Sequence, residues 1–374
     1  MGTRSAQKNG IELHGFPELD GGLPLIGHLG EMYKRFPDLC ARGARAHGRY
    51  FWINAGPGSR QLMCADPSAL AILKHGGASS SFYTERFEAL LGNTLFAFDG
   101  DEHRRARQPI TPPFTPQRVR GSDVVRIVVE AVSSRVETWI DKGAFDVVAE
   151  TREIALEIIF RMIGVPPTRL AEWRTQYNRY LLAALPSSGT VRGPLYHYAK
   201  RGRDWIDAQL GAIVDSLRAS EETTTLAGAM ANGRDDEGRL LDRGLVVSNL
   251  RLLIFAGHET TASGIAWSTL HLATSSELQR RLVVEAGIAS DPAAAATDLS
   301  RFTFAERMFR EAIRLYAPVH SVLRRLTTPL EIDGVTLPAG LVVALPFIHW
   351  LRDPARFVSP GRFDPERLHE RPRP

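Results

Sequence analysis

The sequence predicts a mainly α-helical protein with a small β portion. From about residue 100 onward, apolar residues recur at three- and four-residue spacing, which is the period of a helix with one buried face. Strand-like patterns are short and are found at residues 50–64 and 329–350. With 44% hydrophobic and 24% charged residues, the composition is that of a globular protein. Because no linker divides the chain, we expect a single domain over residues 1–374.

The β portion begins with an expected hairpin. The segments "YFWI" (50–53) and "RQLMC" (60–64) flank the turn "NAGPGS", whose Gly and Pro residues are typical of a chain reversal. The later stretch "PLEIDGVTLPAGLVVALPFIHW" alternates and turns in the manner of several short strands.

Helices are expected over most of the remaining chain. The pair "PQRVRGSDVVRIVVEAVSSRVETWI" and "ETREIALEIIFRMI" ends at "GVPP", because Pro cannot continue a helix. Two more helices are expected over 168–186 and 194–219, and the weakly polar stretch 220–238 is interpreted as a surface connection. A further helix is expected with Ser276 as its N-cap, and the helix "FAERMFREAIRLY" follows it.

The most informative helix is expected to begin near Asp242. Between Gly244 and Ser276 the only full charges are those of Arg251 and Glu259. A continuous helix of about 33 residues would be roughly 50 Å long at 1.5 Å per residue. Because it is apolar nearly all round, we expect it to run through the middle of the molecule.

Composition narrows the class of protein. The net charge is only +4, and basic residues stand among acids, which argues against a nucleic-acid surface. Cys40 and Cys64 are the only cysteines, so no disulfide framework is expected and a reducing cytoplasm is the default. The N-terminus lacks the apolar core of a signal peptide, and no apolar run is long enough for a membrane anchor. Richness in Arg and Ala favours a bacterial source.

The segment "FAGHETTAS" lies in the middle of the expected central helix. A zinc-protease motif would need a second His where Ala262 stands, so that interpretation is excluded. Ala256 and Gly257 leave a position with almost no side chain, and Glu259 and Thr260 follow directly. Taken alone, the pattern fits either a packing Gly in a buried helix or a small-ligand pocket with an acid–alcohol pair that delivers protons.

Two further pairs allow a structural and a functional interpretation. Glu311 and Arg314 are one turn apart, as in an ordinary surface ion pair. His103 and Arg107 are four residues apart on an expected helix. They form either a solvated basic face or two donors that clamp a carboxylate or phosphate.

In this order, "HRRAR", "AGHETT", "EAIR" and "FDPERL" together resemble the cytochrome P-450 family of haem-thiolate monooxygenases, and "LPLIGHL" extends the resemblance over almost the whole chain. The resemblance implies a haem b cofactor (iron protoporphyrin IX) and insertion of one atom of dioxygen into an apolar small molecule. Electrons would come from NAD(P)H through a separate ferredoxin or reductase. Glu259 and Thr260 would be the proton-relay pair, and Ala256 and Gly257 would open the oxygen-binding groove.

The resemblance also implies roles for charged residues outside the central helix. His103, Arg107 and Arg324 would hold the haem propionates through charge-assisted hydrogen bonds. A further triad would form a buried structural network below the haem. Its members are Glu311, Arg314 and Arg367.

The substrate contacts are expected in two loops and on the two helices that flank the segment "PSSGTVRG". Phe87, Leu91 and Phe96 belong to the first loop, and Val319 and Val322 to the second.

The family's iron-ligating Cys lies in a Gly-rich loop shortly after the segment that corresponds to "PERL". Only seven residues follow Arg367, and none is Cys or Gly. Neither Cys40 nor Cys64 matches the family's proximal side. We therefore expect a domain that is incomplete at its C-terminus, lacking the proximal loop and last helix, with the Cys ligand beyond Pro374 and no metal ligand within the chain.

Two alternatives to the monooxygenase remain open. One is a peroxide-using or isomerising haem enzyme on the same fold, against which Glu259 and Thr260 argue. The other is a catalytically dead fragment or a non-catalytic binding protein. The polar residues of "AGHETT" and "HRRAR" argue against it, because without haem they have no reason to be there.

Overall fold

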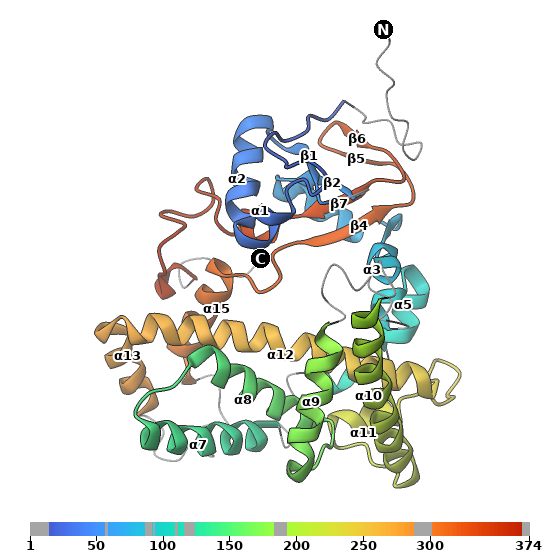
Figure 1. Cartoon of the computed structure of the whole chain (residues 1–374), viewed down its shortest axis with the longest axis vertical. Helices are drawn as coiled ribbons and strands as arrows, with labels where there is room; N and C mark the ends of the chain where they lie inside the picture. Colours follow the sequence, from blue (N-terminus) through green and yellow to red (C-terminus); the bar gives the residue numbers. More distant parts are fainter. Residues whose placement is uncertain are drawn as a thin grey trace. The chain divides into compact units, whose positions relative to one another are not determined.

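The computed structural model describes residues 15–56, 59–86, 92, 94–108, 111–115, 124–182, 193–287 and 301–368. The chain forms two compact units, each assembled from segments distant in sequence. The first, the sheet unit, comprises Met1–Phe82 and Val319–Gly361, and the second, the helical unit, comprises Tyr83–Pro318 and Arg362–Pro374. The expectation of a mainly helical protein with a small β portion is confirmed (Figure 1). A single domain over 1–374 stays a prediction.

The sheet unit is built on a five-stranded sheet in the order β1-β2-β7-β4-β3. The expected hairpin is confirmed, since β1 and β2 pair antiparallel with Tyr50 opposite Cys64. β7 is parallel to β2, and β4 is antiparallel to both β7 and β3. The strands are β1 (Tyr50–Asn54), β2 (Arg60–Cys64), β3 (Ala78–Ser79), β4 (Val322–Leu326) and β7 (Val342–Leu345), and a separate hairpin joins β5 (Leu330–Ile332) to β6 (Val335–Leu337).

Short helices complete the sheet unit. The alternating apolar side chains of the strands form one buried cluster with Ile72 and Trp350. Helix α2 contributes Phe36 and Leu39 to the interior. The helices are α1 (Leu29–Lys34), α2 (Phe36–His47), η1 (Pro67–Lys74) and α16 (Phe347–Trp350).

The helical unit contains most of the helices. Its α-helices are α5 (Gly100–Arg107), α7 (Val124–Lys142), α8 (Val147–Met162), α9 (Leu170–Leu181), α10 (Pro194–Ala219), α11 (Leu226–Ala231), α12 (Arg243–Ala273), α13 (Ser276–Ala286) and α15 (Thr303–Leu315). Its short 3₁₀ helices are η2 (Leu95–Ala97), η4 (Pro112–Phe114), η5 (Pro167–Arg169) and η8 (Pro365–Leu368). Helix α3 (Ser81–Arg86) contains the position in the sequence where the first unit ends, at Phe82, and the second begins, at Tyr83.

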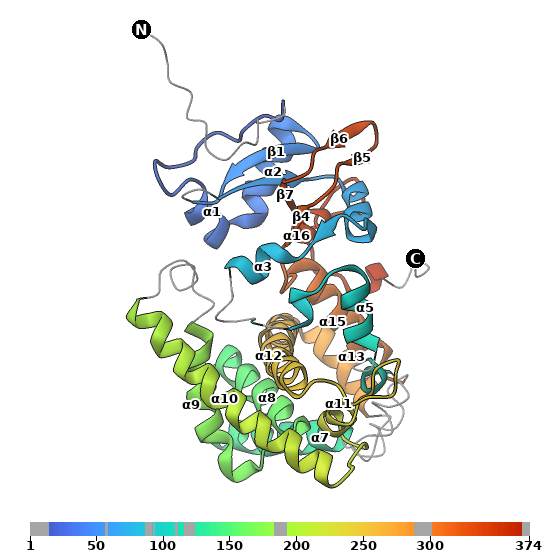
Figure 2. The ribbon, with the colours of Figure 1, turned by 90° about the vertical axis from the view of Figure 1, so that its right-hand side faces the viewer.

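Helix α12 is the long central helix expected from the sequence. Asp242 caps its N-terminus, where the side-chain oxygen accepts a hydrogen bond from the backbone N–H of Leu245 at 2.8 Å. Figure 2 looks nearly along α12 and shows α8, α10, α11, α13 and α15 gathered around it. Surrounded in this way, the helix has no need of a polar face over its first half.

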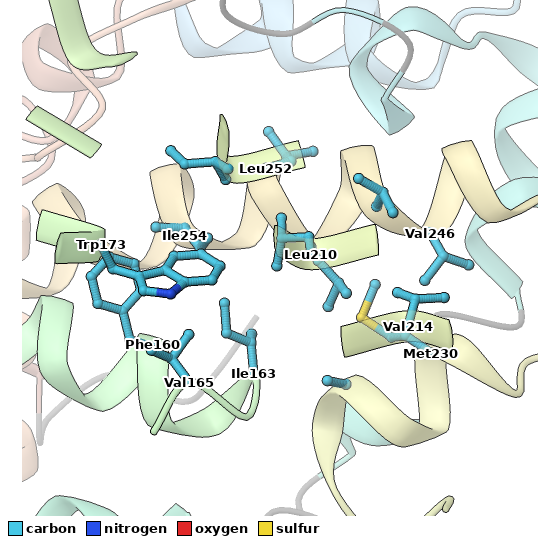
Figure 3. Close-up of a cluster of buried hydrophobic side chains, with 14 of the residues drawn as sticks. Phe160, Ile163, Val165, Trp173, Leu210, Val214, Met230, Val246, Leu252 and Ile254 are labelled. Atoms are coloured by element: carbon cyan, nitrogen blue, oxygen red, sulfur yellow. The ribbon is translucent and has the colours of Figure 1, made fainter. Parts of the chain in front are cut away.

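The largest buried cluster of the helical unit lies between α12 and the helices around it. Figure 3 shows Trp173 and Phe160 against Ile254 of α12, with Leu210 of α10 farther along the same helix. Phe160 and Trp173 meet with their ring centroids 5.3 Å apart. Burial of such large apolar side chains is the main stabilising contribution to this unit.

Two local expectations were wrong. The N-cap of α13 is Ser275, whose hydroxyl accepts the N–H of Leu278 at 3.3 Å, while Ser276 is already helical. The stretch 220–238 is not merely a surface connection, because it contains α11, with Leu226 and Met230 buried. Its few apolar residues were too short a run to reveal a helix that is stabilised by packing.

Among the helices of the described segments, none combines the length and the apolar composition that crossing a membrane requires.

Candidate active site

The burial of helix α12 changes halfway along its length. Every residue from 246 to 252 is buried, as expected of a helix inside a core. Farther on, Ala256 and Thr261 are exposed, and Gly257 and Thr260 are half-buried. We call these four residues the open stripe of α12. Ala256 and Gly257 precede Thr260 and Thr261 by three to five residues, so the two pairs share one face of the helix.

One hydrogen bond links a hydroxyl residue of the open stripe to a small one. The hydroxyl of Thr260 donates a hydrogen bond to the carbonyl oxygen of Ala256 at 2.6 Å. Such a bond from a Thr to the residue four positions earlier is a known cause of local helix bending. A Cβ atom at Gly257 would meet Ile159 of α8 at 3.4 Å. Gly257 therefore also serves the contact between α12 and α8.

Glu259 points to α8 and not to Thr260. Arg152 of α8 donates from Nε and Nη2 to one carboxylate oxygen, Oε2, at 3.2 and 3.1 Å. The side chains of Glu259 and Arg152 remain 40% and 53% exposed, respectively, so the pair lies in contact with solvent. Glu259 and Thr260, the predicted proton-relay pair, are therefore neighbours in sequence but have different partners. Glu259 is bonded to Arg152, and Thr260 is bonded to the carbonyl oxygen of Ala256.

His258 connects α12 to α9. Its ring is 4% exposed, and its Nδ1 lies 3.2 Å from the hydroxyl of Tyr177 on α9. The same nitrogen is 3.6 Å from Oε1 of Glu259. Burial lowers the pKa of His258, and the negative charge of Glu259 opposes this only in part. Because its pKa is lowered, the imidazole of His258 is neutral beside the carboxylate of Glu259.

Helix α5 carries the first pair of predicted propionate donors. His103 is half-buried and Arg107 is exposed, one turn apart. Arg104, on the same helix, is paired with Asp101 at 3.1 Å. Within the described segments, neither His103 nor Arg107 has a side-chain hydrogen-bond partner. Two such donors at one helical turn suit a carboxylate.

Arg324, the third predicted propionate donor, belongs to the sheet unit. It lies in the middle of β4 and is half-buried. Its Nη1 donates to the carbonyl oxygen of the preceding residue, Leu323, at 2.8 Å.

The predicted network around Glu311 is present as a closed set of contacts. Arg314 donates from Nε to Oε2 of Glu311 at 2.7 Å and from Nη2 to Oε1 at 2.8 Å. Arg367 of η8 donates to Oε1 at 3.2 Å, and the backbone N–H of Asp364 donates to the same oxygen at 3.0 Å. The side chain of Glu311 is 0% exposed, so this is not the surface ion pair that the sequence alone would favour.

A second ion network holds the residue next to Arg367. Glu366 pairs with Arg281 of α13 and, at 3.2 Å, with Arg307 of α15. Both guanidinium groups lie over the ring of Phe304. η8 is therefore bound to α13 and α15 through two adjacent side chains of opposite charge.

The predicted substrate contacts are distributed over both units. In the helical unit, Phe96 is 40% exposed and meets Tyr83 edge to face, with ring centroids 5.9 Å apart. In the sheet unit, Val319 is 48% exposed, while Val322 packs against the core of the sheet. Phe87 and Leu91 lie outside the described residues.

Neither cysteine has the surroundings of a metal ligand. Cys40 and Cys64 are both 0% exposed and belong to the sheet unit. Burial raises the pKa of Cys40 to about 12 and raises that of Cys64 still further. Because the thiolate is the ligating form, both thiols are unsuited to bind iron.

Two charged residues of the central helix, Arg251 and Glu259, have partners that the sequence did not predict. Arg251 is 1% exposed, and its Nε donates to Asp207 of α10 at 2.6 Å. The sequence shows Arg251 as a charge in an apolar helix, but its partner Asp207 lies 44 residues away in the chain. Arg152, the partner of Glu259, lies 107 residues away. No spacing rule links residues that only tertiary packing brings together.

Comparisons with known proteins agree with this arrangement. The family model for cytochrome P-450 matches residues 190–372. A cytochrome P-450 BJ-4 homolog of Sinorhizobium fredii is 33% identical over 358 residues, which are 96% of this chain and 80% of that protein. The cyclooctat-9-en-7-ol 5-monooxygenase of Streptomyces melanosporofaciens is 24% identical, over 93% of this chain and 78% of its own.

The fold is also found among solved structures. The structure of retinoic acid bound cyanobacterial CYP120A1 superimposes with a TM-score of 0.79 at 21% identity, over 95% of this chain and 82% of that one. The sequence relatives and the fold together identify the class of protein as haem-binding oxidoreductases. The chain belongs to the cytochrome P-450 family.

The residues of this chain fit part of a haem site. His103 and Arg107 of α5, which have no side-chain partner within the described segments, suit the propionates, and the open stripe of α12 carries only small and hydroxyl side chains. The buried thiols of Cys40 and Cys64 do not suit the iron.

Proposed function

We propose that this protein is a haem-dependent monooxygenase that inserts one atom of dioxygen into an apolar small molecule. The observation that carries the proposal is the open stripe of α12. A helix buried on all sides from 246 to 252 then exposes two small residues and two hydroxyl residues beside an acid. A helix that served packing alone would have no reason to place such residues there.

The haem, when bound, would supply the iron at which dioxygen is bound and reduced. His103 and Arg107 would hold its propionates, because both donors lack a partner within the described segments. Arg324 is proposed as a third donor. Ala256 and Gly257 would leave space for dioxygen next to the helix.

Thr260 and Glu259 would handle protons. The hydroxyl of Thr260, which donates to the carbonyl oxygen of Ala256, could instead donate a hydrogen bond toward the space beside the helix. Glu259 is half-exposed, so its carboxylate can take up protons from solvent and pass them on. The neutral ring of His258 fixes the helices on either side of it.

The substrate is proposed to be largely hydrocarbon. Phe96 and Val319 present exposed apolar surface in the segments where contacts were predicted. The names of two relatives refer to retinoic acid and to cyclooctat-9-en-7-ol, which are both mostly hydrocarbon. Electrons are proposed to come from NAD(P)H through a separate ferredoxin or reductase.

The experiment compares two neighbouring threonines in haem-loaded protein. Thr260→Ala is expected to lower the fraction of consumed electrons found in oxidised product and to raise the release of hydrogen peroxide. Thr261→Ala is the matched control, because its hydroxyl is exposed and it is not part of the predicted pair. Equal coupling in both variants would contradict the role of Thr260.

A further inference from the structure

The short helix η2 is attached to α12 by one buried side chain. The amide oxygen of Asn249 accepts a hydrogen bond from the backbone N–H of Leu95 at 3.0 Å. These residues are 154 positions apart in sequence, and Asn249 is only 2% exposed. η2 carries Phe96, whose ring is partly open to solvent.

The amide of Asn249 has a fixed orientation. Its nitrogen donates to the carbonyl oxygen of Leu245, four residues earlier on α12, at 2.8 Å. With the nitrogen held in this way, the oxygen must point toward Leu95. Asn is a poor helix former, and a buried amide costs free energy unless it is fully bonded. Its presence in the buried run of α12 therefore indicates a positional role.

Two other contacts fix the same segment from different helices. Arg203 of α10 covers Gly92, where an added Cβ would lie 2.4 Å from a guanidinium nitrogen. Gly92 has a φ of +55°, a conformation that glycine adopts without strain. On the other side, Tyr83 meets the ring of Phe96. The segment around η2 is therefore attached to α10, to α12 and to Tyr83.

We propose that Asn249 is a positioning residue that sets the place of Phe96 and thereby the selectivity for the shape of an apolar substrate. This inference rests on the proposed function, in which Phe96 contacts the substrate. At 2% exposure Asn249 is closed to a substrate, so it acts through Leu95 and the ring that follows it. The hydrogen bond to α12 couples the helix that carries Glu259 and Thr260 to the apolar contact surface.

The first test measures hydrogen exchange at the amide of Leu95. Asn249→Leu and Asn249→Ala remove the acceptor and are expected to speed exchange there by about tenfold or more, since a buried donor loses its partner. Thr94→Val is the matched control. The hydroxyl of Thr94 is buried without a hydrogen-bond partner in the described segments, so its removal should leave exchange at Leu95 unchanged. Unchanged exchange in both Asn249 variants, or an equal rise throughout α12, would overturn the proposal.

The second test asks whether Asn249 acts through Phe96. Binding of the neutral fluorescent probe N-phenyl-1-naphthylamine is measured in Asn249→Leu, Phe96→Ala and the double variant. We expect Asn249→Leu to weaken binding by roughly threefold when Phe96 is present and to have no effect in the Phe96→Ala background, as coupled residues behave in a double-mutant cycle. Additive effects would overturn the proposal. Neither test needs haem or turnover, so a failure of the monooxygenase function would be seen separately, in the comparison of Thr260→Ala with Thr261→Ala.

Discussion

Two carboxylates of the helical unit are each bound by arginine, yet their surroundings are opposite. Glu311 is fully buried and receives hydrogen bonds from two arginines and a backbone N–H. Glu259 is 40% exposed and has one arginine, Arg152, which is itself 53% exposed. A histidine with a lowered pKa stands near each carboxylate, His271 near Glu311 and His258 near Glu259.

The difference sets the structural role expected of Glu311 apart from the chemical role proposed for Glu259. A buried carboxylate with every oxygen bonded is fixed in place, and loss of one partner leaves a charge without compensation. A half-exposed carboxylate with one solvated partner can release that partner at little cost and can exchange protons with water. Both sites pair a glutamate with arginine. The two sites differ in burial and in the number of hydrogen-bond donors, so these two features distinguish the expected roles.

The largest effect is expected at the buried site. Glu311→Gln should lower the free energy of unfolding by about 3–5 kcal/mol, because it leaves Arg314 and Arg367 as buried charges without a counterion. Urea denaturation measures the change. Glu306→Gln is the matched control on the same helix, since Glu306 and Arg310 form an exposed pair at 2.6 Å. Its loss should cost less than about 1 kcal/mol. A similar loss of stability in both variants would contradict the expectation that the buried pair contributes more than the exposed one.

Arg107, which has no side-chain partner within the described segments, should behave in the opposite way to Arg314. Arg107→Ala is expected to weaken haemin binding by about tenfold, the loss of one charge-assisted hydrogen bond, and to leave the free energy of unfolding unchanged. An absorbance titration with haemin measures the affinity. Arg105→Ala, on the same exposed helix, serves as the control and should bind haemin normally. Equal weakening in both variants would point to general electrostatic attraction.

The exposed arginine at the second carboxylate should matter little for stability. Arg152→Ala is expected to change the free energy of unfolding by less than about 1 kcal/mol, because a solvent-exposed ion pair contributes little. Thermal and urea unfolding measure it. A loss as large as that of Glu311→Gln would mean that Glu259 is as structural as Glu311.

The smallest effect concerns pH. The folded protein holds the pKa of His258 below the ordinary value of about 6.5. On acidification below about pH 6.5 the unfolded chain binds a proton that the folded chain does not yet bind, so stability falls. His258→Gln should therefore make the melting temperature less dependent on pH between about pH 6.5 and 5. His271→Gln should do the same, since burial also lowers the pKa of His271. An unchanged pH profile in both variants would contradict this assignment.

Much of the helical unit could be predicted from the sequence. The extent of α12 followed from a long run with only two full charges and from the capping residue Asp242. The network around Glu311 followed from a family resemblance, because the spacing of Glu311 and Arg314 alone favoured a surface pair. Those features depend on local pattern or on motif order.

The remainder depends on packing between distant segments. Nothing near Glu259 in the sequence points to Arg152, and nothing near Asn249 points to Leu95. Helix α11 was missed because a run as short as "LAGAMA" forms a helix only when it is buried.

The adjacent charges of η8 have a consequence for how the end of the described chain is placed. Glu366 meets Arg281 and Arg307, and the next residue, Arg367, meets Glu311. If this segment slipped by one residue, Arg367 would face Arg281 and Arg307 in one direction of slip, and Glu366 would face Glu311 in the other. Such like-charge contacts are unfavourable, most of all beside Glu311, whose side chain is 0% exposed. The order of two neighbouring letters, Glu before Arg, therefore permits only one alignment of the segment.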